Sequence, residues 1–151
     1  MRHNPYDDVK VVGGTSLAPQ SFTGSSAVDG SSVDTSGADN AAIYAYGAET
    51  SGSPSAATLV VTLQESANGT NGWANALDNT GTVIGFTLNC ESAAAENVAR
   101  IEGLGLNRKR YLRAVITPSF TGGSSPAILG FAQIILGNDQ QLPVDANASN
   151  T

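Results

Sequence analysis

The feature that most constrains this chain is an alternation of apolar and polar side chains with a period of two. It is clearest over residues 57–65, where the apolar positions of one face are Leu59, Val61 and Leu63. The opposite face carries polar side chains, interrupted only by Val60: Thr58, Thr62 and Gln64. Because side chains alternate between the two faces of a β-strand, this pattern predicts a strand with one face buried.

Similar short runs follow along most of the chain, at residues 27–34, 43–46, 81–88, 98–101, 110–117 and 127–136. Dense turn signals separate them, among them Asn68-Gly69, Asn71-Gly72 and Gly122-Gly123. Short alternating strands with a turn about every dozen residues predict an all-β, antiparallel sandwich or barrel. The one stretch with helical character is 91–100, where three alanines favour one or two helical turns within a loop.

The pattern divides the chain into three parts: an extended N-terminal arm at 1–25, a single β-sandwich domain at 26–137 and a polar C-terminal tail at 138–151. The arm buries little by itself, so we expect it to order against a neighbouring molecule. Its apolar residues are candidate interface residues: Val9, Val11, Val12 and Leu17. On this interpretation, removing residues 1–20 weakens binding to that neighbour and leaves the sandwich folded.

The charge content, the length of the apolar runs and the single cysteine limit which partners and which cellular compartment the sequence fits. Only 13% of the 151 residues are charged and the net charge is −6, which disfavours a free nucleic-acid binder. No apolar run reaches the roughly 20 residues that span a bilayer, and the N-terminus lacks the apolar region of a signal peptide. Cys90 is the only cysteine, so no intrachain disulfide can form. We expect a soluble protein made in the cytoplasm, without membrane contact.

The side chains that enzymes need are scarce. The only histidine, His3, falls in the expected arm, and Cys90 has no imidazole partner, so it should pack as a small hydrophobe. One histidine and one cysteine cannot close a zinc site, and no phosphate-binding glycine loop occurs. We therefore expect no enzyme, no cofactor and no metal.

Carboxylates are the remaining catalytic option, because a glycosidase needs only two. Candidates beside turns are Asp29, Asp34, Asp39, Glu65 and Glu91, where capping of backbone amides is the commoner role. Residues 29–34 also resemble a calcium loop, but they lack its ligand spacing.

Basic side chains gather in one block. Five of the seven lie between residues 100 and 113: Arg100, Arg108, Lys109, Arg110 and Arg113. One interpretation places them on a loop and a strand with packed stems and solvated charges. A second makes them an interface for an acidic protein partner or for a neighbouring subunit. A nucleic-acid patch is disfavoured, because Tyr111 is the only aromatic residue among them.

Several segments together resemble small virion proteins of tailed bacteriophages. They occur in the same order and at similar spacing: 27–37 (AVDGSSVDTSG), 58–69 (TLVVTLQESANG), 98–101 (VARI), 109–115 (KRYLRAV) and 134–137 (IILG), with Pro143 soon after. The resemblance spans roughly residues 17–143. One departure is the turn at Ser66-Ala67-Asn68-Gly69, where the family usually has Ser-Asp-Asp-Gly. The turn is retained, but any contact that depends on an acid there would be lost.

The resemblance implies a head-decoration, or cement, protein encoded beside the major capsid protein. Such proteins tend to be jelly-roll-like sandwiches that assemble as trimers or dimers on the capsid surface, and they have no catalytic residues. The expected partners are therefore the major capsid protein and other copies of this chain, as a homotrimer or a dimer. The expected location is the capsid surface of the virion, and the neighbour that residues 1–20 help to bind is then the capsid.

Three alternatives remain open. A carbohydrate- or receptor-binding sandwich would expose an aromatic platform built from some of Trp73, Tyr44, Tyr46 and Tyr111. Trp73 is instead expected to fill the sandwich edge. A head–tail connector or tail-tube component would assemble as a ring. A glycosidase or peptidase would depend on a single essential carboxylate.

Overall fold

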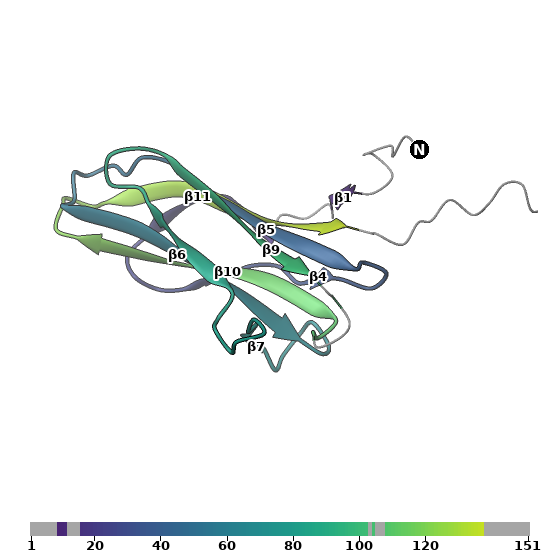
Figure 1. Ribbon diagram of the computed structural model, residues 1–151. Coiled ribbons are helices and arrows are strands. Elements are labelled where there is room, and N and C mark those ends of the chain that lie inside the picture. Colours follow the sequence, from purple (N-terminus) through teal and green to yellow (C-terminus); the bar gives the residue numbers. More distant parts are fainter. Residues whose placement is uncertain (1–8, 12–15, 103, 105–107, 138–151) are drawn as a thin grey trace, which may run out of the picture.

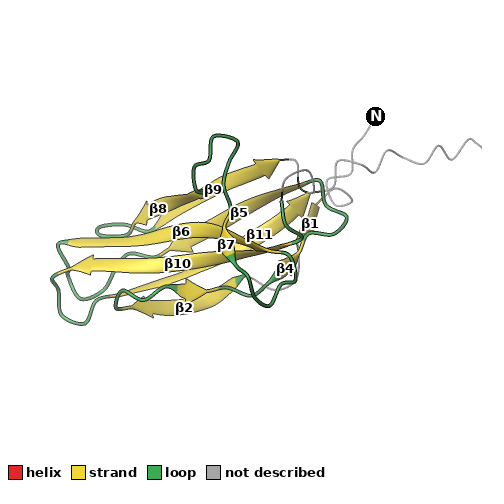
Figure 2. Ribbon diagram, turned by 90° about the horizontal axis from the view of Figure 1, so that it is seen from below, coloured by secondary structure: helices red, strands yellow, loops and turns green. Residues whose placement is uncertain are grey.

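A computed structural model describes residues 9–11, 16–102, 104 and 108–137 of the chain. The described residues form eleven β-strands and no helix, and the strands pack as two antiparallel sheets (Figures 1 and 2). Sheet A contains β1 (Val9–Val11), β2 (Leu17–Thr23), β5 (Asn40–Gly47), β9 (Ala95–Glu102) and β11 (Ala127–Gly137). Sheet B contains β3 (Val28–Asp29), β4 (Val33–Asp34), β6 (Ala56–Ser66), β7 (Ala74–Asn75), β8 (Gly85–Asn89) and β10 (Tyr111–Thr121). The all-β sandwich expected from the period-two pattern is confirmed.

The strands of the first half of the chain pair with those of the second half in reverse order, as in one long hairpin whose tip lies between β6 and β8. Going outward from the tip, β6 pairs with β8, β5 with β9, β3 and β4 with β10, and β2 with β11. The folded hairpin closes through two further pairings, β11 with β5 and β10 with β6. The resulting strand orders are β2-β11-β5-β9 in sheet A and β3-β10-β6-β8 in sheet B. Strands that follow one another in the sequence therefore mostly lie in different sheets. This connectivity is that of a jelly roll.

The core lies between the two sheets and follows the alternation seen in the sequence. Leu59, Val61 and Leu63 of β6 are fully buried, whereas Val60 points outward and is 37% exposed. Cys90 is also fully buried in this core, and burial raises the pKa of its thiol. The expectation that Cys90 packs as a small hydrophobe is confirmed.

The helical expectation for residues 91–100 is wrong. The segment from Ala95 to Glu102 is β9, and all eight of its residues pair in register with β5. Alanine favours a helix only weakly, and the ladder to β5 together with the burial of Ile101 outweighs that preference.

The expected N-terminal arm is too long. Residues 17–23 form β2, which pairs with β11, and Leu17 and Phe22 belong to the core. Just before β2, Ser16 is 2% exposed. Because Ser16 and Leu17 are buried in the sandwich, we now expect the removal of residues 1–20 to destabilise it. The tail at 138–151 lies outside the described residues.

Candidate functional site

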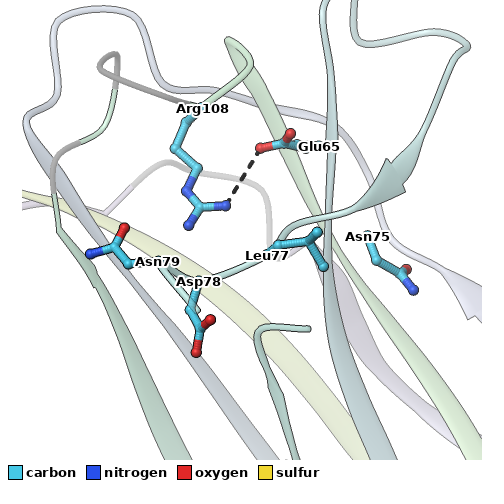
Figure 3. A pocket seen from close by; sticks show the side chains of 6 residues that line it. All are labelled: Glu65, Asn75, Leu77, Asp78, Asn79 and Arg108. Carbon is cyan, nitrogen blue, oxygen red and sulfur yellow. Dashed lines mark ion pairs between the residues drawn. The ribbon is translucent and has the colours of Figure 1, made fainter. Parts of the chain in front are cut away.

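The first part of the basic block lies at the end of the sandwich where β6 and β10 meet. Arg108 faces Glu65 of β6, with a guanidinium nitrogen 3.8 Å from the carboxylate oxygen and both side chains largely buried. Together they line a hollow of about 440 Å³ whose other walls are Asn75, Leu77, Asp78 and Asn79 (Figure 3). The hollow is polar, and the charge of Arg108 is directed at Glu65 within it.

The next arginine, Arg110, is held by Asp34 of β4. Two guanidinium nitrogens donate to the two carboxylate oxygens at 2.9 and 2.7 Å, the paired geometry that arginine and carboxylates favour. These hydrogen bonds raise the pKa of the Arg110 guanidinium above its ordinary value. The guanidinium also lies 5.3 Å from the centre of the Tyr111 ring. Both partners of the ion pair are solvent-exposed, so it adds little stability.

Arg113 of β10 has the most partners. Its guanidinium donates twice to the Oε1 atom of Gln64, at 2.9 and 2.7 Å, and lies 3.0 Å from a carboxylate oxygen of Asp29. The same group sits 4.5 Å above the ring of Trp73. Trp73, expected to fill the sandwich edge, therefore lies half-buried against an arginine near the end of sheet B.

The basic block is thus divided. Arg108, Arg110 and Arg113 are bound within the chain, and the side chain of Lys109 is exposed. Arg100 lies in β9 of the other sheet, opposite Ala42. These pairings favour the interpretation of the block as part of the sandwich itself. Its role as a docking surface stays a prediction.

The four apolar residues expected at an interface, Val9, Val11, Val12 and Leu17, have different places in the structure. Leu17 is 4% exposed and packs in the core, so it cannot serve as an interface residue in the folded sandwich. The backbone of Val9 and Val11 pairs with the end of β11 in the same chain. Val12 lies outside the described residues.

A different surface stands out on the outer face of sheet A. Tyr46 of β5 lies directly opposite Phe131 of β11, and Tyr44 lies one step further along β5 on the same face. The Phe131 ring centre is 5.8 Å from each tyrosine ring centre, so the three rings form a continuous row. The hydroxyl of Tyr44 donates to Glu96 of β9 at 2.7 Å, which raises the pKa of Tyr44.

Apolar side chains extend this row on both sides. Leu129 of β11 is 57% exposed and Val98 of β9, opposite Tyr44, is 48% exposed. We call eight of the outward residues of sheet A the aromatic face: Tyr44, Tyr46, Glu96, Val98, Leu129, Phe131, Gln133 and Ile135. Glu96 is its only described acidic side chain.

The outer face of sheet B is chemically different. Five of its positions across β8, β6 and β10 carry hydroxyl groups, with Val60 and Val115 among them: Thr58, Thr62, Thr87, Thr117 and Ser119. The sandwich therefore has one polar outer face and one aromatic and apolar outer face. An exposed apolar patch on a folded domain marks a site of interaction.

The aromatic face was not expected as a protein interface from the sequence. Tyr44 and Tyr46 were expected only as possible members of a glycan platform, and Phe131, Leu129 and Val98 were not expected to form a surface site. The available signal was the alternation in 43–46 and 127–136, where bulky residues occupy the outward positions as well as the inward ones.

The described residues contain no group of three histidine, cysteine, aspartate or glutamate side chains placed to hold a metal ion. Three of the candidate catalytic carboxylates, Asp29, Asp34 and Glu65, face arginines. Within the described part of the chain, no helix is long and apolar enough to cross a membrane.

No protein-family model and no curated protein sequence matches this chain. One solved structure is similar, a chain of turnip yellow mosaic virus, with 13% sequence identity and a TM-score of 0.32. The match covers 86% of this chain and 77% of that chain. A likeness at this score carries no argument about function, and the jelly-roll assignment rests on the strand order.

Proposed function

We propose that the chain is a structural virion protein that decorates the outer surface of a bacteriophage head and stabilises the junctions between capsomers. The observation that carries the proposal is the aromatic face of sheet A, which presents an apolar surface from a domain with few charges. The sequence resemblance to head-decoration proteins supplies the partner, the major capsid protein.

The proposed mechanism is binding linkage. A protein that binds assembled capsid, but not free subunits, stabilises the shell by an amount that grows with occupancy. Burying the aromatic face would remove apolar surface from water, and most of its residues are uncharged, which limits the desolvation cost.

The test is co-sedimentation of the purified chain with purified, expanded phage heads. Replacing Leu129 by serine removes an exposed apolar side chain of the aromatic face, and we expect roughly tenfold weaker binding. The matched control is Val60→Ser, which makes the same kind of change on the outer face of sheet B. Equal binding by the two variants would contradict the proposed surface, and absence of binding by the unmodified chain would contradict the function.

A second candidate function is carbohydrate binding. The row of Tyr44, Phe131 and Tyr46 favours it, because the rings lie half-buried on the outer face and could stack on the apolar faces of sugar rings. Gln133 and Glu96 lie beside them and could accept or donate hydrogen bonds. Saturable binding on a glycan array that Phe131→Ala abolishes, without binding to heads, would favour this function over decoration.

A further inference from the structure

Strand β9 forms an unusually regular sheet edge. It runs for eight residues without proline, and every residue from Ala95 to Glu102 is in register with β5. Among the other described edges, β3, β4 and β7 have two residues each, and β8 has five. Strand β2 contains Pro19 and a register shift against β11. Short, shifted or proline-containing edges resist pairing with another chain, whereas a long regular edge invites it.

The hydrogen bonds of β9 indicate which backbone groups face outward. The Val98 amide donates to the side-chain Oδ1 atom of Asn97, at 2.8 Å. Just past β5, the Ala48 amide donates to the carbonyl of Leu129 in β11, so the even-numbered residues of β5 face β11 and its odd-numbered residues face β9. In an antiparallel ladder, alternate residues direct both of their backbone groups to the same side. The backbone groups of Glu96, Val98 and Arg100 therefore point away from β5. The outward amide of Val98 donates to the side chain of Asn97 on the same strand, so a backbone carbonyl of a second strand could replace that acceptor.

Charge identifies the partner. We propose that β9 pairs antiparallel with β9 of a second copy of this chain, about a two-fold axis at Val98. That register places Glu96 of each copy opposite Arg100 of the other, so two pairs of opposite charges form. If the two-fold axis is moved to Ala99, Glu96 lies opposite Glu102 of the other copy. If it is moved to Arg100, Arg100 lies opposite its own copy. A register centred on Ile101 would also place opposite charges together, Arg100 against Glu102, but it pairs only the last three residues of β9. Among the registers that pair at least five residues of β9, only the one centred on Val98 places opposite charges against each other, and its two-fold axis makes the contact self-complementary.

The pairing also has a consequence for the aromatic face. Val98, 48% exposed in the single chain, would lie beside its own copy, with Tyr44 one strand further in on both sides. The two sheets A would become one continuous sheet whose outer face carries both aromatic rows. This inference goes beyond the proposed function and does not depend on it, because it concerns self-association alone.

The test is sedimentation of the purified chain over a range of concentrations. We expect a reversible monomer–dimer equilibrium. The variant Val98→Pro removes the outward amide without removing a bond to β5, and proline is tolerated on sheet edges, so we expect a folded monomer. Circular dichroism checks its folding.

A charge-exchange series separates the proposed register from a general effect on folding. Glu96→Arg and Arg100→Glu each place like charges opposite one another, and we expect each to weaken the dimer about tenfold. Mixing the two variants restores both opposite-charge pairs, so the mixture should form a heterodimer at the original strength. Glu91→Arg, an equal charge change in an exposed turn, is the control and should leave the dimer unchanged.

A chain that remains monomeric at every concentration would overturn the inference. So would a dimer or trimer that Val98→Pro leaves intact, or a mixture of the two charge variants that associates no better than either alone. If Val98→Pro fails to fold, the charge-exchange series decides the question.

Discussion

Ser16 offers a sharp test of how the N-terminal segment contributes to the sandwich. Its hydroxyl accepts a hydrogen bond from the buried amide of Ala114 in β10, at 2.7 Å, and donates to the carbonyl of Ser31 at 3.1 Å. Ala114 lies where the edge of sheet B is interrupted, between the residues of β10 that pair with β3 and those that pair with β4. Ser16 thus replaces the missing strand partner of Ala114. The space is tight, because a Cβ atom on Gly30 would collide with Ser16.

Replacing Ser16 by alanine leaves the Ala114 amide buried without an acceptor. The expected loss is about 1–3 kcal/mol of the free energy of unfolding, the usual cost of an unsatisfied buried amide. For a domain of this size, each kcal/mol lowers the melting temperature by about 2–4 °C. Urea denaturation measures the loss as a shift of the unfolding midpoint, and an m-value equal to that of the unmodified chain shows that the shift is a change of stability.

The matched control is Ser21→Ala, an exposed position in β2 that should change stability by no more than about 0.5 kcal/mol. A Ser16→Ala variant as stable as this control would refute the claim that residues 16–23 are part of the folded sandwich.

Three further predictions concern particular side chains. Arg113→Lys keeps the positive charge but loses the forked contacts and the stacking on the tryptophan ring, so urea denaturation should show about 1–2 kcal/mol of destabilisation; equal stability would contradict this. In Gly47→Ala the new methyl group would lie 2.6 Å from the sulfur of Cys90, so urea denaturation should show that the free energy of unfolding falls by about 1–3 kcal/mol. An unchanged free energy of unfolding would contradict this. Ultraviolet titration should place the pKa of Tyr44 above 10.0, and Glu96→Gln should lower it. Because the folded-state pKa is raised, the stabilisation linked to it is complete below the unfolded pKa and is lost as pH rises through the folded pKa; an unchanged pKa in the variant would contradict the assigned hydrogen bond.

Much of the fold could be predicted from local pattern. The alternation of Leu59, Val61 and Leu63 is a local property of the chain, and it correctly gave a strand with one buried face. Only the second half of β9, residues 98–101, was expected as a strand, because the alanines and charges before it carry no strong β preference and the pairing with β5 involves residues far away in the sequence. The same applies to β2, whose place in sheet A depends on β11 at the other end of the chain.

The candidate surfaces were harder to predict, because they consist of contacts between distant segments. The partners of the basic block lie far from it in the sequence, and Asp34, for example, is 76 residues from Arg110. The sequence therefore showed a cluster of charges without showing that those charges are paired. Tyr46 and Phe131 become neighbours only when β5 pairs with β11. Strand alternation alone could identify them as outward, but not as members of one row.

The most direct test of the proposed function is a density map of the phage virion that carries this chain. The proposal predicts jelly-roll density on the outer surface of the head, at junctions between capsomers, with the aromatic face of sheet A turned toward the major capsid protein. Density for this chain in the tail or connector, its absence from the head, or a head-bound sandwich whose aromatic face points to solvent would contradict it.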